Sequence, residues 1–281
     1  MVKVCLSLIL VLFSGTVWAQ TGAYTNVAEN RQMLWTEVNL VYKTKGPWSF
    51  QIDHQYRRQA ADVGTRDWNI VRYPLLQVFR PWIAYEVSES VKLSLSPVGL
   101  WWNWQRELED PSTKFFQEIR IIPQLQITRP VGDGQLIQRY RTELRWPSAL
   151  DTVSRSYLFL ADGEPELVLA DRFDVRVRAM ARWLNPIFQR TPDEKRWYSH
   201  LSVEPMVVVS DKSISFNQNR SLLALGRYLN KSIRVELGYL NQFSINKRAA
   251  EQVRTFRFNN ALHVYLYAEN ATQWFERKRD R

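Results

Sequence analysis

Cysteine is almost missing from this chain of 281 residues, and the single one, Cys5, lies among the first ten residues. The rest of the chain can therefore form no disulfide bond and no thiolate metal site. Histidine is also scarce. The three residues, His54, His200 and His263, have no close spacing, so we expect no metal site and no other cofactor.

Long apolar runs are absent after the first segment of the chain. The mean hydropathy is -0.36, and no later stretch approaches the roughly 20 apolar residues that a membrane-spanning helix needs. This excludes a helical membrane protein. It does not exclude a membrane β-barrel, because only every second residue of a barrel strand meets lipid.

The first segment has the layout of a secretory signal peptide. Lys3 supplies a positive start, Val4 to Phe13 form an apolar run, and Val17-Trp-Ala19 precedes a cleavage point. The apolar run is too short to serve as a spanning anchor. We therefore expect a cleaved signal peptide at residues 1–19, a mature chain that starts at Gln20, and export from the cytoplasm.

Extended segments with two different faces fill the rest of the chain. In residues 135–146, charged side chains occupy every second position from Arg139 to Arg145, and mainly apolar ones stand between them, because side chains alternate across a strand. Residues 172–184 repeat the design. Eleven strand-like segments can be identified: 34–43, 48–57, 68–87, 91–104, 114–128, 135–146, 172–184, 197–210, 216–229, 231–245 and 254–267.

We interpret these segments as an all-β chain that forms a closed antiparallel transmembrane β-barrel over residues 20–270, followed by a basic C-terminal tail at 271–281. Bacterial single-chain barrels generally have an even number of strands, so we expect about twelve. The additional strand would lie near residues 21–32 or inside the 147–170 loop. Proline removes a ladder hydrogen bond, so bulges or strand ends are expected at three prolines inside predicted strands: Pro97, Pro123 and Pro205.

Two further patterns are typical of a barrel in a membrane. Connections near residues 45, 88, 130 and 230 are short, and those near 60, 106, 147–170, 211 and 247 are longer, as expected for periplasmic turns against outer loops. Tryptophans gather near predicted strand ends, where their rings suit the lipid headgroup level: Trp48, Trp68, Trp101, Trp102, Trp104, Trp146, Trp183 and Trp197. Such rings could also fill a sandwich core, so a soluble periplasmic β-sandwich is an alternative.

Five motifs follow one another along the chain: Glu118-Ile-Arg120, Gln138-Arg-Tyr-Arg-Thr-Glu143, Arg172 to Arg178, Asn219-Arg220 with Gly226 and Tyr228, and Glu236-Leu-Gly-Tyr239. Their order resembles that of an uncharacterised bacterial barrel family, domain of unknown function 2490. The resemblance covers residues 34–267. It implies a β-barrel in the outer membrane of a Gram-negative cell envelope and carries no established activity or ligand. The 147–170 loop and the basic tail depart from the family pattern.

The formal net charge is +10 and the isoelectric point is near 9.8, which would suit nucleic acid, anionic lipid or an anionic solute. The arginines are spread through strands and not massed in a tail, so we expect no nucleic-acid partner. They share strand faces with acidic residues, and we expect this charge network to line the lumen: Glu118, Arg120, Arg139, Arg141, Glu143, Arg145, Arg172, Asp174, Arg176, Arg178, Glu204, Arg220, Arg234 and Glu236.

Two roles fit such a lumen. Rings of arginine select anions, so the barrel could be a narrow channel for small anionic solutes. Arg–carboxylate pairs could instead close the lumen and hold the barrel rigid, since long arginines would crowd a bore of about twelve strands. We favour the structural role. The expected partners are outer-membrane lipid and, during insertion, the barrel-assembly machinery.

One trio of residues could carry chemistry. His200, Ser202 and Glu204 share one face of a predicted strand, and such side chains are the parts of a hydrolase site. Same-face neighbours on one strand lie about 7 Å apart at Cβ, too far for a hydrogen bond unless the side chains lean together. The trio should also point into the lumen, away from acyl chains. A lipid hydrolase that uses Ser202 and His200 is therefore an alternative, and we do not expect an enzyme.

Overall fold

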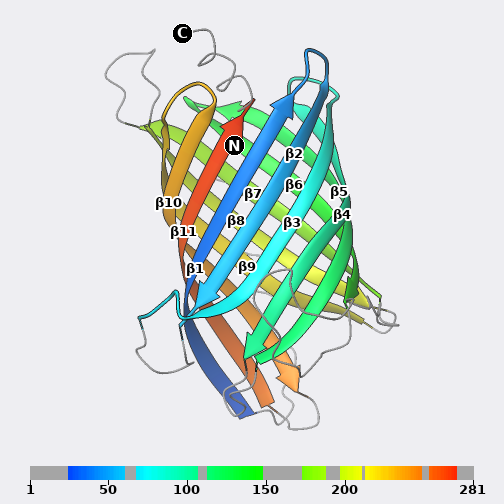
Figure 1. The fold of residues 1–281 in the computed structure, drawn as a ribbon, viewed down its shortest axis with the longest axis vertical. Coiled ribbons are helices and arrows are strands. Elements are labelled where there is room, and N and C mark those ends of the chain that lie inside the picture. The colour runs from blue at the N-terminus through cyan, green and yellow to red at the C-terminus, as the bar shows by residue number, and fades with distance from the viewer. Residues whose placement is uncertain are drawn as a thin grey trace, which may run out of the picture.

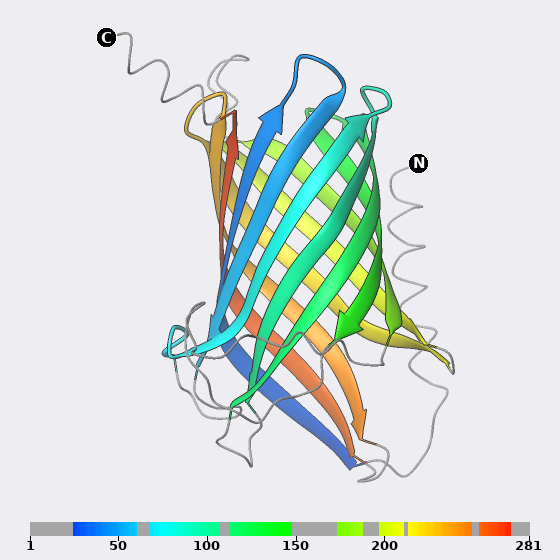
Figure 2. The same cartoon turned by 45° about the vertical axis from the view of Figure 1, so that its right-hand side comes forward.

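A computed structural model describes residues 25–60, 68–106, 113–147, 173–187, 197–210, 213–248 and 253–270 of the protein. These residues form one β-sheet that closes into a barrel (Figure 1, Figure 2). In chain order the strands are β1 (Thr25–Lys43), β2 (Trp48–Gln59), β3 (Tyr73–Glu86), β4 (Val91–Arg106), β5 (Thr113–Val131), β6 (Gly134–Pro147), β7 (Asp174–Ile187), β8 (Trp197–Ser210), β9 (Ser213–Tyr228), β10 (Ile233–Arg248) and β11 (Val253–Glu269). The predicted signal peptide, the basic tail and most of the 147–170 loop lie outside the described residues.

Closure of the sheet confirms the predicted barrel fold. The sandwich alternative is wrong in its fold, because the described strands form one sheet that closes on itself and not two stacked sheets. The eleven strands are close to the expected number of about twelve. Residues 25–32, one proposed location of an additional strand, are the first part of β1. Within the described part of the chain, no helix is long and apolar enough to cross a membrane.

Strand direction differs from the all-antiparallel expectation at one seam. Consecutive strands pair antiparallel all along the chain, but β1 and β11 pair parallel, from Thr25 opposite Val253 to Val41 opposite Glu269. The cause is the odd number of strands: when directions alternate, the first and the eleventh strand run the same way.

Polar contacts tie both ends of this parallel seam. At one end, the Arg257 Nε–H donates to Glu29 at 2.7 Å. At the other end, the Lys43 ammonium lies 3.2 Å from Glu269, and the Lys43 backbone N–H donates to the Asn270 side chain at 2.8 Å. The seam is therefore closed by side chains as well as by the backbone ladder.

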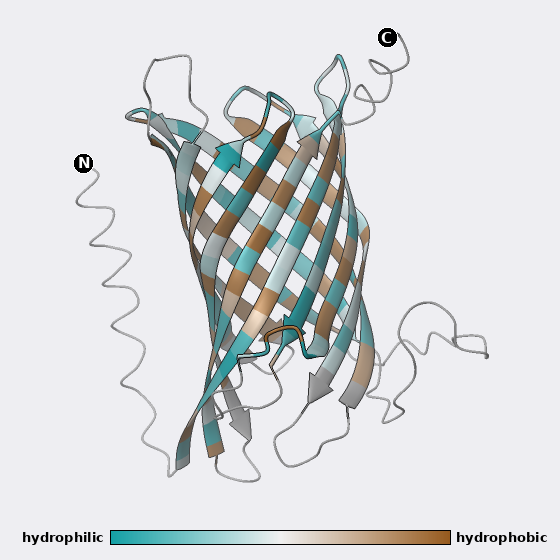
Figure 3. Cartoon of the chain, turned by 60° about the vertical axis from the view of Figure 1, so that its left-hand side comes forward, coloured by the Kyte–Doolittle hydropathy of each residue, from teal (hydrophilic) through white to brown (hydrophobic). Residues whose placement is uncertain are grey.

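The two faces of the sheet have opposite character. Along β2, Asp53 and Arg57 are buried inside the barrel, whereas Trp48, Phe50 and Ile52 are exposed on its outer surface. Figure 3 shows the same alternation of polar and apolar residues along neighbouring strands. A strand with a period of two places these residues on opposite faces, so the sequence pattern alone dictates which face turns inward.

The three prolines expected at irregularities lie at breaks in the ladders. Pro97 lies inside the register shift between Ser96 and Gly99. Pro123 lies where the β5–β6 pairs are interrupted, and Pro205 lies where the β7–β8 pairs are interrupted between Val203 and Met206. Proline has no N–H to donate, so the ladder breaks where the ring stands, and this prediction is confirmed.

The bulge at Pro97 also explains why one tryptophan prediction is wrong. Before the bulge, the buried residues of β4 are Ser94 and Ser96; after it, they are Gly99 and Trp101, so the inward positions change from even to odd numbers. Trp101 is 4% exposed and lies in the lumen, not in an outer girdle. Gly99 leaves space for it, because a Cβ there would lie 2.5 Å from the Trp101 ring.

The two ends of the barrel carry different connections. One end has the short connections 44–47, 87–90, 132–133 and 229–232 together with the longer connection 188–196, and β11 also finishes there (Figure 1, top). The opposite end carries 60–72. The expectation of longer connections near residues 211 and 247 is wrong, because only 211–212 separate β8 from β9 and only 249–252 separate β10 from β11.

Candidate functional site in the barrel lumen

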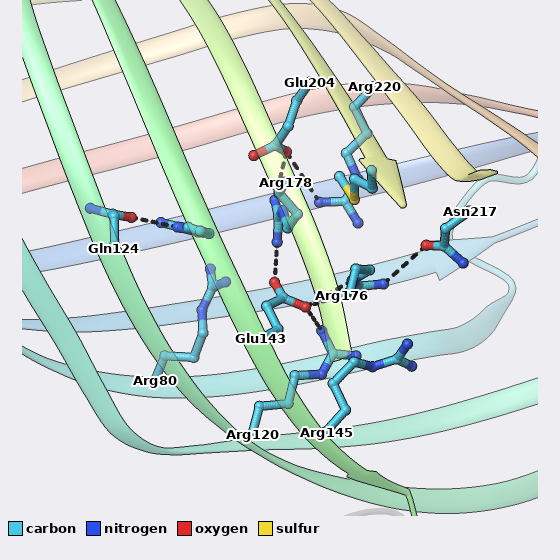
Figure 4. Close-up of polar contacts among 12 residues, drawn as sticks. Arg80, Arg120, Gln124, Glu143, Arg145, Arg176, Arg178, Glu204, Asn217 and Arg220 are labelled. Carbon is cyan, nitrogen blue, oxygen red and sulfur yellow. Dashed lines mark hydrogen bonds and ion pairs between the residues drawn. The ribbon is translucent and has the colours of Figure 1, made fainter. Parts of the chain in front are cut away.

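The structure places the predicted charge network inside the barrel. Nine of its members are at most 8% exposed: Glu118, Arg120, Arg141, Glu143, Asp174, Arg176, Arg178, Glu204 and Glu236. Arg139, Arg145, Arg220 and Arg234 are partly buried on the same inner face. Arg172 lies outside the described residues. Most of the predicted set therefore lies on the inner face of the barrel. Figure 4 shows the part of this network around Glu143.

Glu143 is the centre of the network. Its carboxylate is fully buried and accepts hydrogen bonds from three arginines of β5 and β7: Arg120 at 2.9 Å, Arg176 at 2.5 Å and Arg178 at 2.5 Å. Arg176 is directly opposite Glu143 in the β6–β7 register, so the ladder itself brings the charges together. Charge-assisted hydrogen bonds of this kind are the strong ones in proteins.

Ion pairs extend from this centre in both directions along the lumen wall. Besides Glu143, Arg178 also binds Glu204 of β8, at 2.6 Å. Arg139 binds the same Glu204 carboxylate at 2.9 Å. Toward the opposite end, Arg145 binds Glu118 at 2.5 Å and Asp174 at 3.0 Å. A continuous chain of ion pairs thus runs along β5, β6, β7 and β8.

Aromatic rings lie against several arginines of the lumen. The Arg57 guanidinium lies 3.2 Å from the centre of the Trp35 ring, and Arg220 lies 4.8 Å from the same ring. Arg120 lies 3.9 Å above Trp101. A ring face attracts a cation, most strongly where water is excluded, so these tryptophans stabilise the guanidinium groups inside the lumen.

Sequence reasoning missed part of this lumen. The buried pair Asp53–Arg80 and the buried rings Trp35 and Trp82 belong to it, on β1, β2 and β3. Asp53 falls on the polar face of a cleanly alternating segment, and that signal could have identified it. The inward rings could not be found by polarity, because a tryptophan fits either face of a barrel wall.

A cavity of about 80 Å³ remains between the walls. A single water needs about 10–15 Å³, so the cavity has room for several waters or one small anion. Arginines outnumber carboxylates two to one in its lining: Arg80, Arg139, Arg141, Arg178, Arg182 and Arg220 against Glu37, Glu204 and Glu236. The cavity is therefore an electropositive space enclosed by the barrel.

The hydrolase-like trio takes a different form from the expected one. His200 and Ser202 lean together, with His200 Nε2 at 3.2 Å from the Ser202 hydroxyl. Their carboxylate partner is Glu236 of β10, which lies 2.8 Å from His200 Nδ1. Glu204, the expected partner, is instead occupied by Arg139 and Arg178. At one wall of the cavity, hydrogen bonds thus link the Ser202 hydroxyl to His200 and His200 to the Glu236 carboxylate.

Comparisons with known proteins identify a family and nothing finer. The family described as "Protein of unknown function (DUF2490)" matches residues 32–254. No curated protein and no solved structure matches the chain. Among the described residues, no group of three or more His, Cys, Asp and Glu side chains could hold a metal ion.

Replacing Glu143 tests the charge network. Glu143→Gln keeps the shape of the side chain but leaves Arg120, Arg176 and Arg178 without their shared charge. Breaking a buried pair in this way costs about 3–5 kcal/mol, so we expect a loss of that order in the free energy of unfolding. Denaturant titration followed by circular dichroism measures it.

The matched control is Glu269→Gln, which removes the partly exposed carboxylate beside Lys43. An exposed pair contributes about 0.2–1 kcal/mol, so this variant should lose far less stability. Equal losses in the two variants would contradict the central position given to Glu143.

Proposed function

The chain belongs to the DUF2490 family of proteins of unknown function, and from this premise we propose that it is an outer-membrane β-barrel whose lumen is closed by ion pairs and holds small anions. It would be exported by its signal peptide and inserted by the barrel-assembly machinery. The observation that carries the proposal is the distribution of side chains across one closed sheet: apolar outside and charged inside.

The outer surface supports the membrane assignment. Large apolar side chains are exposed on the outer face around the sheet: Leu40, Phe50 and Ile52, then Phe79, Ile83, Leu93 and Leu95, then Tyr140, Val177 and Leu201, then Leu223, Leu225, Leu237, Tyr239, Leu262 and Val264. Soluble monomers rarely expose contiguous apolar patches larger than a few hundred Å². Hydrocarbon would cover this surface in a membrane, as it covers the apolar band of outer-membrane barrels.

The packing of the interior supports a closed lumen. Glu143, Val78 and Ile122 are 0% exposed, although all three side chains point into the barrel. Charged side chains of β5 and β6 lie against an apolar cluster inside the barrel, with Arg120 over the Trp101 ring and Arg141 over the Trp82 ring. The cluster consists of Leu76, Val78, Trp82, Trp101 and Ile122. In an open aqueous pore, these inward-facing side chains would be exposed to water. The structural role is therefore better supported than steady conduction.

The excess of arginine supports anions as the occupants. Burying a charge without a partner is costly, and the lining of the cavity carries more cations than carboxylates. A small anion placed there would reduce the repulsion among the guanidinium groups. The same lining would repel cations, so the solute would be anionic if the lumen ever opened.

An arginine on the outer surface tests the membrane assignment. Leu223 is 62% exposed and lies beside Leu201 and Tyr239 on neighbouring strands. In lipid, Leu223→Arg should cost about 2–4 kcal/mol in the free energy of unfolding, because the charge would enter hydrocarbon. Urea unfolding from lipid vesicles, followed by tryptophan fluorescence, measures the change.

The control for this test is Leu229→Arg, in the short turn between β9 and β10. Leu229 is similarly exposed, at 56%, but lies at the end of the barrel. Leu229→Arg should therefore lower the free energy of unfolding by only about 0–1 kcal/mol. In a water-soluble barrel both substitutions would be nearly neutral, and that result would refute the membrane assignment.

Conductance tests the closed lumen. In planar bilayers the unmodified protein should show no steady conductance. Arg178→Ala removes the side chain that joins Glu143 to Glu204 and should produce an anion-selective current, read from the reversal potential in a salt gradient. Arg227 is an exposed arginine near the end of β9, and Arg227→Ala should produce no current across the bilayer. Porin-like conductance of the unmodified protein would contradict closure.

A further inference from the structure

We propose that Ser202, His200 and Glu236 form a nucleophilic site that hydrolyses small anionic carboxylic esters inside the lumen. The nucleophile is inferred from the hydrogen bonds of the three residues alone. The preference for anionic esters rests on the cation-rich lumen of the proposed function. These two parts can be tested separately.

The hydrogen bonds fix the role of each histidine nitrogen. A carboxylate can only accept, so the contact of 2.8 Å between Glu236 and His200 Nδ1 places the proton of a neutral imidazole on Nδ1. Nε2 is then free to accept the hydrogen of the Ser202 hydroxyl, 3.2 Å away. This is the arrangement in which a histidine acts as general base toward a serine.

The carboxylate is itself held in place. Tyr198 donates its hydroxyl to the second oxygen of Glu236 at 2.7 Å. The two residues belong to strands on either side of β9, and both are level with Gly226 in the register. A Cβ at Gly226 would lie 2.1 Å from the Tyr198 ring, so only glycine lets the tyrosine reach across β9. Gly226 therefore provides the space that the hydrogen bond between Tyr198 and Glu236 requires.

The surroundings of Ser202 suit an ester. His200 is 1% exposed and Glu236 is 4% exposed, whereas Ser202 is more accessible and lines the cavity. Arg182 stands opposite Ser202 in the β7–β8 register and lines the same cavity, so its guanidinium can stabilise the oxyanion that forms at the carbonyl. Trp35, Leu222 and Leu240 supply apolar walls.

The reaction balances with water as the only co-reactant. The Ser202 Oγ forms a bond to the carbonyl carbon and its proton passes to His200 Nε2. The bond to the alcohol oxygen breaks, and the alcohol takes that proton and leaves an acyl-Ser202. Water then attacks the acyl carbon while Nε2 takes its proton. The bond to Oγ breaks, Ser202 regains the proton, and the carboxylic acid departs.

The position of the site excludes the lipid substrate considered from sequence. All three side chains face the lumen, and the apolar outer surface lies on the opposite side of the sheet. A cavity of about 80 Å³ also leaves no room for a long acyl chain. The substrate class is therefore a short ester whose negative charge is attracted by the arginines.

The experiment compares two short acetate esters that differ by one carboxylate: acetoxyacetate and methyl acetate. The full chain is purified in detergent, and the release of acetate is followed by proton NMR, with each rate divided by that ester's rate with free imidazole. Peptide mapping by mass spectrometry locates the acetyl group. We expect acetyl-Ser202, and a corrected rate at least tenfold higher for the anionic ester.

Variants separate catalysis from folding. Ser202→Ala should lose the enzyme-dependent release of acetate, and Ser199→Ala, on the outer face of the same strand, should keep it. Glu236→Gln should slow acylation about a hundredfold or more with unchanged circular dichroism, since general-base catalysis contributes about that factor. Absence of acetyl-Ser202 in the unmodified protein would overturn the nucleophilic site. Equal corrected rates for the two esters would overturn the anionic substrate class. Neither result depends on membrane insertion or conductance.

Discussion

Arginine side chains enclosed by a closed sheet are the constraint on which this structure depends. A buried guanidinium is costly unless a carboxylate or an aromatic face compensates it. The barrel supplies both: Glu143 serves three arginines, and Trp35 stacks against two. The charged face can turn inward only because the strands bring these partners into register. The apolar face must then turn outward, where we propose that lipid covers it.

The sequence predicted the faces of the strands well and their connectivity less well. Alternation in residues 135–146 was sufficient to place Arg141 and Glu143 in one enclosed space, because a strand has a period of two. The inward position of Trp101 could not be predicted, since the bulge at Pro97 changes which positions face the lumen. The parallel seam depends on the total number of strands, and no local pattern reports that number.

The same limit applies to the candidate site. His200 and Ser202 were identified together because they share one face of one strand. Glu236 was assigned to the lumen but not to this pair, because the contact crosses β9 and depends on the register of three strands. Gly226 was noted only as part of a motif. Its physical role, to let Tyr198 reach Glu236, is a property of the packed barrel.

The closed lumen and the reactive serine that we propose are compatible. Enclosure lowers the local dielectric, which strengthens the hydrogen bond between His200 and Glu236 and raises the effect of a nearby cation on a developing oxyanion. The hydrogen bonds of Tyr198 and His200 hold the Glu236 carboxylate in place. The closed sheet shows the fold class, and the chemistry that we propose rests on the side chains of this chain.

The central claim is that hydrocarbon covers the apolar face while the charged face is packed inside. Single spin labels at residues 235–242 of β10, introduced in a Cys5→Ser background and reconstituted in lipid vesicles, test it most directly. Collision with dissolved oxygen should alternate with a period of two, high at outward positions such as Leu237 and Tyr239 and low at Glu236 and Leu240. If a water-soluble nickel chelate reached the outward positions better than oxygen did, or if no alternation appeared, the account would be contradicted.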